Sequence, residues 1–69
     1  MDETQKLRIL LPHWIEHNGE HAAEFRECAE RSSKVKDELL AADQLLEEAN
    51  ARLSAALTEL GGPLEYHHV

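Results

Sequence analysis

The chain has 69 residues, enough for one small domain, and such a domain buries only about 60% of the surface that its unfolded chain exposes. Fourteen acidic residues outnumber seven basic ones and give a net charge of −7, which argues against binding to nucleic acid or to a membrane surface. One cysteine excludes an intrachain disulfide and suits a reducing, cytoplasmic compartment, so we expect a metal or a second subunit to support the core.

The composition is helical, because Ala, Leu and Glu are abundant and only six residues are Ile, Val or Thr. Apolar or small residues also recur at alternating steps of three and four, the spacing of helices that pack at a shallow angle. With Asn18 and Ser32 filling two gaps, these seam positions are Leu7, Leu11, Trp14, His21, Phe25, Cys28, Val35, Leu39, Ala42, Leu46, Ala49, Leu53, Ala56 and Leu60. We expect the side chains of Trp14, Phe25 and Cys28 to be buried there.

The first helix is predicted over about residues 12–31. Pro12 lacks a backbone N–H and suits a first helical turn, while Ser32 and Ser33 favour the break that follows. Two alternatives stay open for the preceding segment: residues 4–11 form an earlier helical turn, or Pro12 kinks one longer helix. Gly19 is a weak spot that costs about 1 kcal/mol relative to alanine.

The second helix is predicted over about residues 33–60, where alanine and leucine alternate along the seam. Gly61, Gly62 and Pro63 end this helix and begin a tail over residues 61–69. The expected fold class is therefore all-α, a single domain (1–69) built as an antiparallel helical hairpin. One continuous helix of about 50 residues in a coiled coil is the alternative, because the seam never loses register.

Further apolar side chains lie beside the seam and widen it beyond what two helices need. They are Ile15, Leu40, Leu45 and Leu57. Two hairpins packed face to face would bury this surface, so we expect a homodimer that forms a four-helix bundle.

Five histidines fall in two groups, which are His13, His17 and His21 at steps of four, and His67 and His68 near the C-terminus. Residues four apart lie on one face of a helix, so two neighbouring imidazoles can share one metal ion. We expect His17 and His21 to be the primary ligands of a divalent transition metal ion (Zn, Ni, Co or Cu). The completing ligands are His13, Glu24, His67 and His68.

The hairpin fold makes this ligand set possible. An antiparallel second helix ends beside the start of the first, and an extended nine-residue tail reaches up to about 30 Å. All five histidines then gather at one end of the molecule. A continuous helix separates the two groups by about 70 Å. The alternative is that these histidines are solvated surface residues that bind no metal.

Enzymatic motifs are weak, and we expect no catalytic residue. Two His-x-x-Glu-His strings, starting at His13 and His17, match a zinc-protease motif, but an acidic helical chain of this size lacks the third ligand and the cleft. The Glu-x-x-His motif of di-iron bundles is spelled only from Glu65 to His68, which disfavours a ferritin-like oxidase.

The run from Leu10 to Arg26, with an HWIEHN-x-EHA-x-x-F core starting at His13, resembles a group of small bacterial and archaeal proteins of unknown function. A helical second half, a Gly-Gly-Pro-Leu segment at 61–64 and terminal histidines extend the resemblance over most of the chain. The resemblance implies that the histidines and the tail belong together, and it supplies no activity. An aromatic residue is expected where Cys28 stands, a departure that affects the packing there.

Two functional hypotheses of different classes follow. The first is a small dimeric protein that binds metal for sensing, storage or delivery, with a metalloprotein or a metal transporter as its partner. The alternative is a metal-free dimeric protein–protein interaction module whose acidic face or tail docks a partner. Replacing His17 and His21 with glutamine separates the two, because only the first hypothesis needs the imidazoles.

Overall fold

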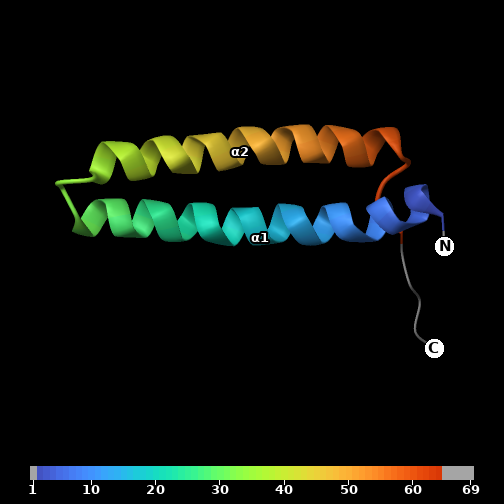
Figure 1. Ribbon diagram of the computed structural model, residues 1–69, viewed down its shortest axis with the longest axis horizontal. Helices are drawn as coiled ribbons and strands as arrows, with labels where there is room; N and C mark the ends of the chain where they lie inside the picture. Colours follow the sequence, from blue (N-terminus) through green and yellow to red (C-terminus); the bar gives the residue numbers. More distant parts are fainter. Residues whose placement is uncertain (1, 65–69) are drawn as a thin grey trace, which may run out of the picture.

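The computed structural model describes residues 2–64 and forms an antiparallel hairpin of two helices, α1 (Glu3–Arg31) and α2 (Lys36–Glu59). The helices lie side by side in a single layer, with the turn at one end and both ends of the described chain, Asp2 and Leu64, at the other (Figure 1). Within residues 2–64 there is no strand, so the all-α hairpin is confirmed and the single continuous helix is excluded. Neither of these two helices is long and apolar enough to cross a membrane.

The first helix begins at Glu3, nine residues before the predicted start at residue 12. A capping box explains the earlier start, because the Gln5 backbone N–H donates to Asp2 Oδ1 at 2.8 Å and the Asp2 N–H donates to Gln5 Oε1 at 3.3 Å. Such reciprocal bonds satisfy N–H groups that have no partner inside the helix. Pro12 therefore lies inside α1 and not in its first turn.

The end of the described chain compensates for Pro12. Proline has no N–H, so the carbonyl of Arg8, four residues earlier, loses its donor within the helix. The Leu64 N–H donates to that Arg8 carbonyl at 3.2 Å. The Arg8 side chain holds the same segment, because its Nε donates to the Gly62 carbonyl at 2.7 Å. These contacts fasten the segment after α2 to the N-terminal part of α1.

Local backbone hydrogen bonds set both the start and the end of α2. After α1 the Val35 N–H donates to the Ser32 carbonyl at 3.3 Å, and α2 begins at Lys36 instead of the predicted residue 33 because neither serine caps it. After α2, Gly61 and Gly62 take positive φ angles of 100° and 88°. Their N–H groups donate to the carbonyls of Thr58 and Leu57, the Schellman arrangement that turns the chain back towards α1.

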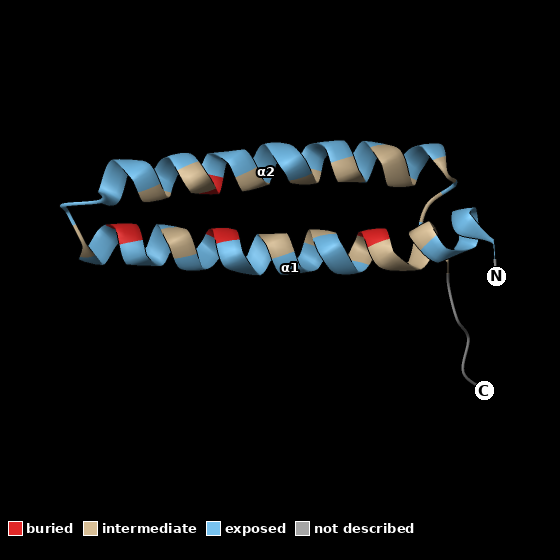
Figure 2. Ribbon diagram, viewed as in Figure 1, coloured by how far each residue is buried: buried red, intermediate tan, exposed pale blue. Residues whose placement is uncertain are grey.

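The seam between the helices is narrow. Only three apolar residues in the described chain are fully buried, namely Leu11, Ala22 and Ala29, all on the side of α1 that faces α2 (Figure 2). The half-buried seam positions around them include Ile15, Asn18, Phe25, Leu39, Leu46, Asn50, Leu53 and Leu57. A core this small is the expected consequence of a single layer, because each helix has only one neighbour against which to bury its apolar stripe.

The predicted seam is wrong at five of its positions. Trp14 and Cys28 were expected to be buried, yet both are exposed, and the seam residues His21, Val35 and Ala49 are exposed as well. In each helix the residue one position further along packs instead. These packed residues are Ile15, Ala22 and Ala29 in α1 and Asn50 in α2.

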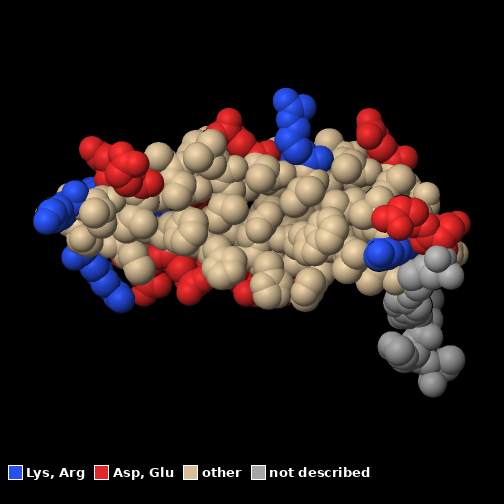
Figure 3. Space-filling model, in the orientation of Figure 1, with Lys and Arg blue, Asp and Glu red and all other residues tan. Residues whose placement is uncertain are grey.

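Two stripes with the same three–four spacing run along α1, and they share Leu11, Asn18 and Phe25. Spacing alone does not distinguish the two stripes. The stripe that packs carries the small residues Ala22 and Ala29, which allow the helices to approach closely. The residues that only the other stripe contains, Trp14, His21 and Cys28, are exposed to solvent. On the face shown in Figure 3, uncharged side chains form a broad band over both helices, and charged groups lie mainly along its margins.

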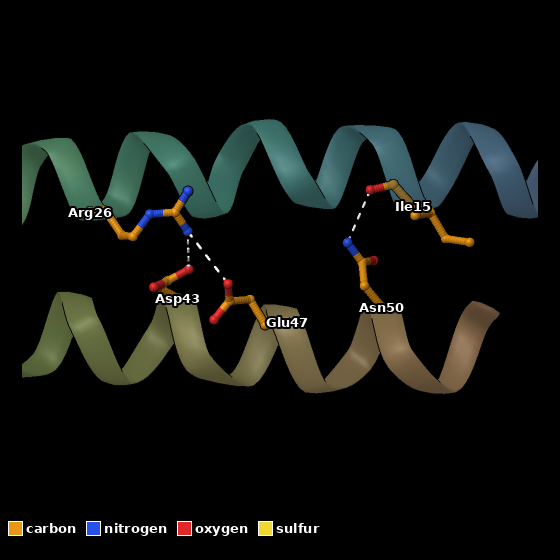
Figure 4. Close-up of polar contacts among 5 residues, drawn as sticks. All are labelled: Ile15, Arg26, Asp43, Glu47 and Asn50. Carbon is orange, nitrogen blue, oxygen red and sulfur yellow. Dashed lines mark hydrogen bonds and ion pairs between the residues drawn. The ribbon is translucent and has the colours of Figure 1, made fainter. Parts of the chain in front are cut away.

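Polar side chains fix the register of the hairpin (Figure 4). Asn50 Nδ2 donates to the Ile15 carbonyl and Asn18 Nδ2 donates to Asn50 Oδ1, each at 3.0 Å. Closer to the turn, the Arg26 guanidinium donates to Asp43 Oδ1 at 2.7 Å. Asp43 is buried, with 7% of its surface exposed, so this contact supplies the partner that a buried carboxylate requires. A shift of one helix along the other would break these contacts.

Candidate metal centre

Three exposed imidazoles lie in a row on α1. His13, His17 and His21 follow one another at steps of four, and a helix places such residues on one side, slightly rotated from step to step. The ring centroids of His13 and His17 are 4.5 Å apart, and those of His17 and His21 are 6.4 Å apart. His17 is therefore the central member and borders both of the others.

These separations fit shared coordination of one metal ion. Two imidazoles on a tetrahedral ion, each with a metal–nitrogen bond of about 2.0–2.1 Å, place their ring centroids about 5 Å apart. The two measured separations, 4.5 Å and 6.4 Å, bracket this value. All three side chains are exposed, so rotation about their side-chain bonds can bring either pair closer to this value. The row can thus offer two nitrogen ligands from neighbouring turns.

His21 has additional contacts that orient its ring. Its Nδ1 lies 3.1 Å from Glu24 Oε1, so a proton on Nδ1 is donated to that carboxylate and Nε2 stays available. The His21 ring also stacks near the Phe25 ring, with centroids 6.5 Å apart and an interplanar angle of 28°. Metal-binding histidines commonly have a carboxylate on the second nitrogen. Glu24, predicted as a completing ligand, is placed here beside an imidazole as an orienting group.

The described residues do not form a complete metal site. Within residues 2–64 no group of three or more His, Cys, Asp or Glu side chains is arranged to hold a metal ion. The predicted ligands His67 and His68 lie outside the described residues. Leu64, just before them, is hydrogen-bonded to Arg8, which is five residues before His13 in α1. The described chain therefore ends beside Arg8, about 7.5 Å along the α1 axis from His13 and about 140° around the helix from it.

Acidic residues accompany the row. Glu16, Glu20 and Glu24 are exposed on the same half of α1 and add to a net charge of −7, which favours the approach of a cation. Glu16 and Glu20 are also the acids of the two His-x-x-Glu-His strings. Over residues 2–64 the fold forms no pocket beside them in which a substrate could bind.

Sequence analysis did not identify Arg8 as important. Its guanidinium and its backbone carbonyl both form hydrogen bonds with the segment after α2. The available signal was the combination of a proline inside a helical pattern with a Gly-Gly-Pro-Leu segment that must return towards it. The guanidinium also donates from Nη2 to the Pro63 carbonyl at 3.4 Å, a weaker contact with the same segment.

Residues 7–60 match a protein family described as a domain of unknown function (DUF8180). This match covers α2 and nearly all of α1, including the histidine row and Pro12. No curated protein and no solved structure matches the chain.

Proposed function

Because the chain belongs to the DUF8180 family, whose function is unknown, we propose a function from its geometry: it binds a divalent transition metal ion through the histidine row of α1. Neutral imidazole favours Zn, Ni, Co or Cu over Mg or Ca. Sensing, storage or delivery of the metal, with a metalloprotein or metal transporter as partner, are the roles open to so small a protein. An exposed thiol at Cys28 suits a reducing cytoplasm.

The observation that carries this proposal is the pair of ring separations, 4.5 Å and 6.4 Å, around His17. His17 pairs with His13 or with His21, and the closer rings make His13 and His17 the nearer match to shared coordination. Glu24 would orient His21 in the second pair. We propose His67 and His68, which lie outside the described residues, as sources of further nitrogens.

The proposal is tested by titrating the tag-free full chain with Zn, Ni, Co and Cu in a calorimeter. We expect a fixed stoichiometry and at least about a tenfold loss of affinity when His17 is removed. The matched variant is His17→Gln combined with Gln44→His, which keeps five histidines but moves one to an exposed position on α2. Wild-type protein that retains no metal, or a swapped variant that binds as tightly, would overturn the proposal.

The pH dependence provides a second test. Imidazole binds a metal only without its proton, so protons compete with the metal for the ring nitrogen as the pH falls. Metal affinity is therefore expected to fall as the pH is lowered from 7.5 to 5. Affinity that stays constant over this range would exclude the histidines as ligands.

A metal-free dimeric interaction module is the second candidate function. The small core favours it, because only three apolar residues are fully buried among residues 2–64 and a second hairpin would supply the missing layer. In either case we propose that two hairpins form a four-helix bundle. If the interaction module is correct, changing His17 and His21 to glutamine leaves folding and association intact.

A further inference from the structure

The solvent-exposed stripe defines a surface that we call the open face. It consists of Trp14, His21, Cys28, Val35, Leu45 and Ala49. The exposed fractions of its large apolar members are 41% for Trp14, 43% for Val35 and 67% for Leu45. Trp14, His21, Cys28 and Val35 are seven residues apart in succession, and the same spacing continues through Ala42 to Ala49. α1 therefore presents one heptad position to solvent at Trp14, His21 and Cys28. In α2 the same series is exposed at Ala49, whereas Ala42 is half-buried.

These residues share one flank of the hairpin. Successive residues of a helix are rotated by about 100°, so Trp14 and Arg26 lie about 120° apart around α1, on either side of the seam. The Arg26–Asp43 pair therefore occupies the opposite flank. On the face drawn in Figure 3, uncharged side chains run across both helices.

A partner for this face must be helical and uncharged where it makes contact. Side chains repeated every seven residues on two adjacent helices fit the holes of another helix pair with the same repeat. A second copy of this chain offers that repeat. The net charge of −7 opposes association of two copies through most of the surface, but the uncharged band allows it without burying like charges.

The size of the face also fits a dimer. A surface as long as α2, with 24 residues and about 36 Å, and two helix widths across, about 22 Å, covers about 800 Å². A face with this outline can accommodate a standard stable interface, in which each partner loses about 800 Å² of accessible surface. The same contact would bury Trp14 and Val35, which are now exposed.

We propose that the open face is the homodimer interface, on which a second copy of the chain packs to complete a four-helix bundle. This inference rests on the proposed dimer and names its contact surface. His21 lies within the interface and His17 and His13 lie progressively further round α1, so dimerisation places the histidine row along the rim of the contact.

The test compares two alanine-to-glutamate variants of the full chain by sedimentation equilibrium, with a chelator present so that metal plays no part. Ala49 lies on the open face, whereas Ala55 is exposed on the side of α2 that points away from α1. We expect a wild-type dimer, at least about a tenfold weaker dimer for Ala49→Glu because a charge would be buried there, and an almost unchanged dimer for Ala55→Glu.

Circular dichroism establishes that both variants remain helical. Should Ala49→Glu fail to fold, the fluorescence of Trp14 in the wild-type chain decides, since we expect its emission to shift to longer wavelength as dilution separates the dimer. A monomeric wild type would overturn both the dimer and this interface. A dimer that Ala49→Glu leaves intact would overturn the interface alone. Neither outcome affects the metal titration, which tests the proposed metal binding separately.

Discussion

The two flanks of the hairpin seam differ in chemistry. On one flank Arg26 bridges to Asp43 at 2.7 Å and lies 3.7 Å from Glu47, so charged groups from both helices neutralise one another within a single chain (Figure 4). On the other flank the open face presents Trp14, Cys28 and Val35 to water. On the first flank the charged groups find partners within the chain, whereas on the second flank apolar side chains remain exposed to solvent.

On the proposed function, this difference separates residues that stabilise the fold from residues that bind a metal or a second copy. Contacts that close within the chain, such as those of Asp43 and Asn50, hold the helices in register. The histidine row borders the other flank, where side chains have room to bind a metal or a second copy. Changes on the polar flank should therefore alter stability, whereas changes on the open face should alter association.

The largest effect on stability is expected from Arg26→Ala. Removing the guanidinium leaves the buried Asp43 carboxylate without its partner, which costs about 2 kcal/mol when discounted for the half-exposed arginine. Urea denaturation measures this loss. The matched control is Arg31→Ala, which breaks only the exposed pair with Glu27 and should cost less than about 0.5 kcal/mol. Equal losses would mean that the polar flank does not stabilise the fold.

The next largest effect is expected from Asn50→Ala, which should lower the free energy of unfolding by about 1.5 kcal/mol. Asn50 donates to the Ile15 carbonyl and accepts from Asn18, so the variant loses two interhelical hydrogen bonds. Asn18→Ala loses only one of them and should cost about half as much. Thermal unfolding of the two variants gives the comparison, and a larger loss for Asn18→Ala would contradict the assigned roles.

Arg8→Ala should release the segment after α2 at a cost of about 1 kcal/mol, because the bond from Nε to the Gly62 carbonyl is part-buried and short. Hydrogen exchange of the Leu64 amide reports the release directly, since that N–H is bonded to the Arg8 carbonyl. We expect faster exchange in Arg8→Ala and no change in Lys6→Ala, a control at an exposed site. Unchanged exchange in Arg8→Ala would show that the guanidinium does not hold the segment.

Gly19→Ala should stabilise the chain by up to about 1 kcal/mol. A methyl group at Gly19 would meet nothing within 4 Å, and alanine has the higher helix propensity. The opposite sign is expected for Gly61→Ala, because Gly61 has a φ of 100°. Chemical denaturation distinguishes the two, and a destabilised Gly19→Ala variant would contradict the exposed helical position assigned to it.

The hairpin itself was predictable from sequence. Helical composition, a three–four repeat and a Gly-Gly-Pro terminator each act locally, so they indicate two helices without tertiary information. The start of α1 was missed because Pro12 was interpreted as a first-turn proline. The capping pair Asp2 and Gln5 was present in the sequence, but the donor that replaces the proline N–H comes from Leu64, which lies 52 residues further along.

The position of the seam was not predictable from spacing. Trp14 and Ile15 belong to two stripes of equal period, and which stripe packs depends on how closely the partner helix approaches. The histidine row was predictable because steps of four fix a helix face. The orientation of His21 by Glu24 and Phe25 required the side-chain positions.

Native mass spectrometry of the tag-free full chain, with and without added Zn, measures association and metal binding together. The account predicts a dimer that carries a fixed number of metal ions and loses them, but stays dimeric, when His13 and His17 are changed to alanine. A monomer that retains no metal would contradict the claim that the open face and its histidine border carry the function.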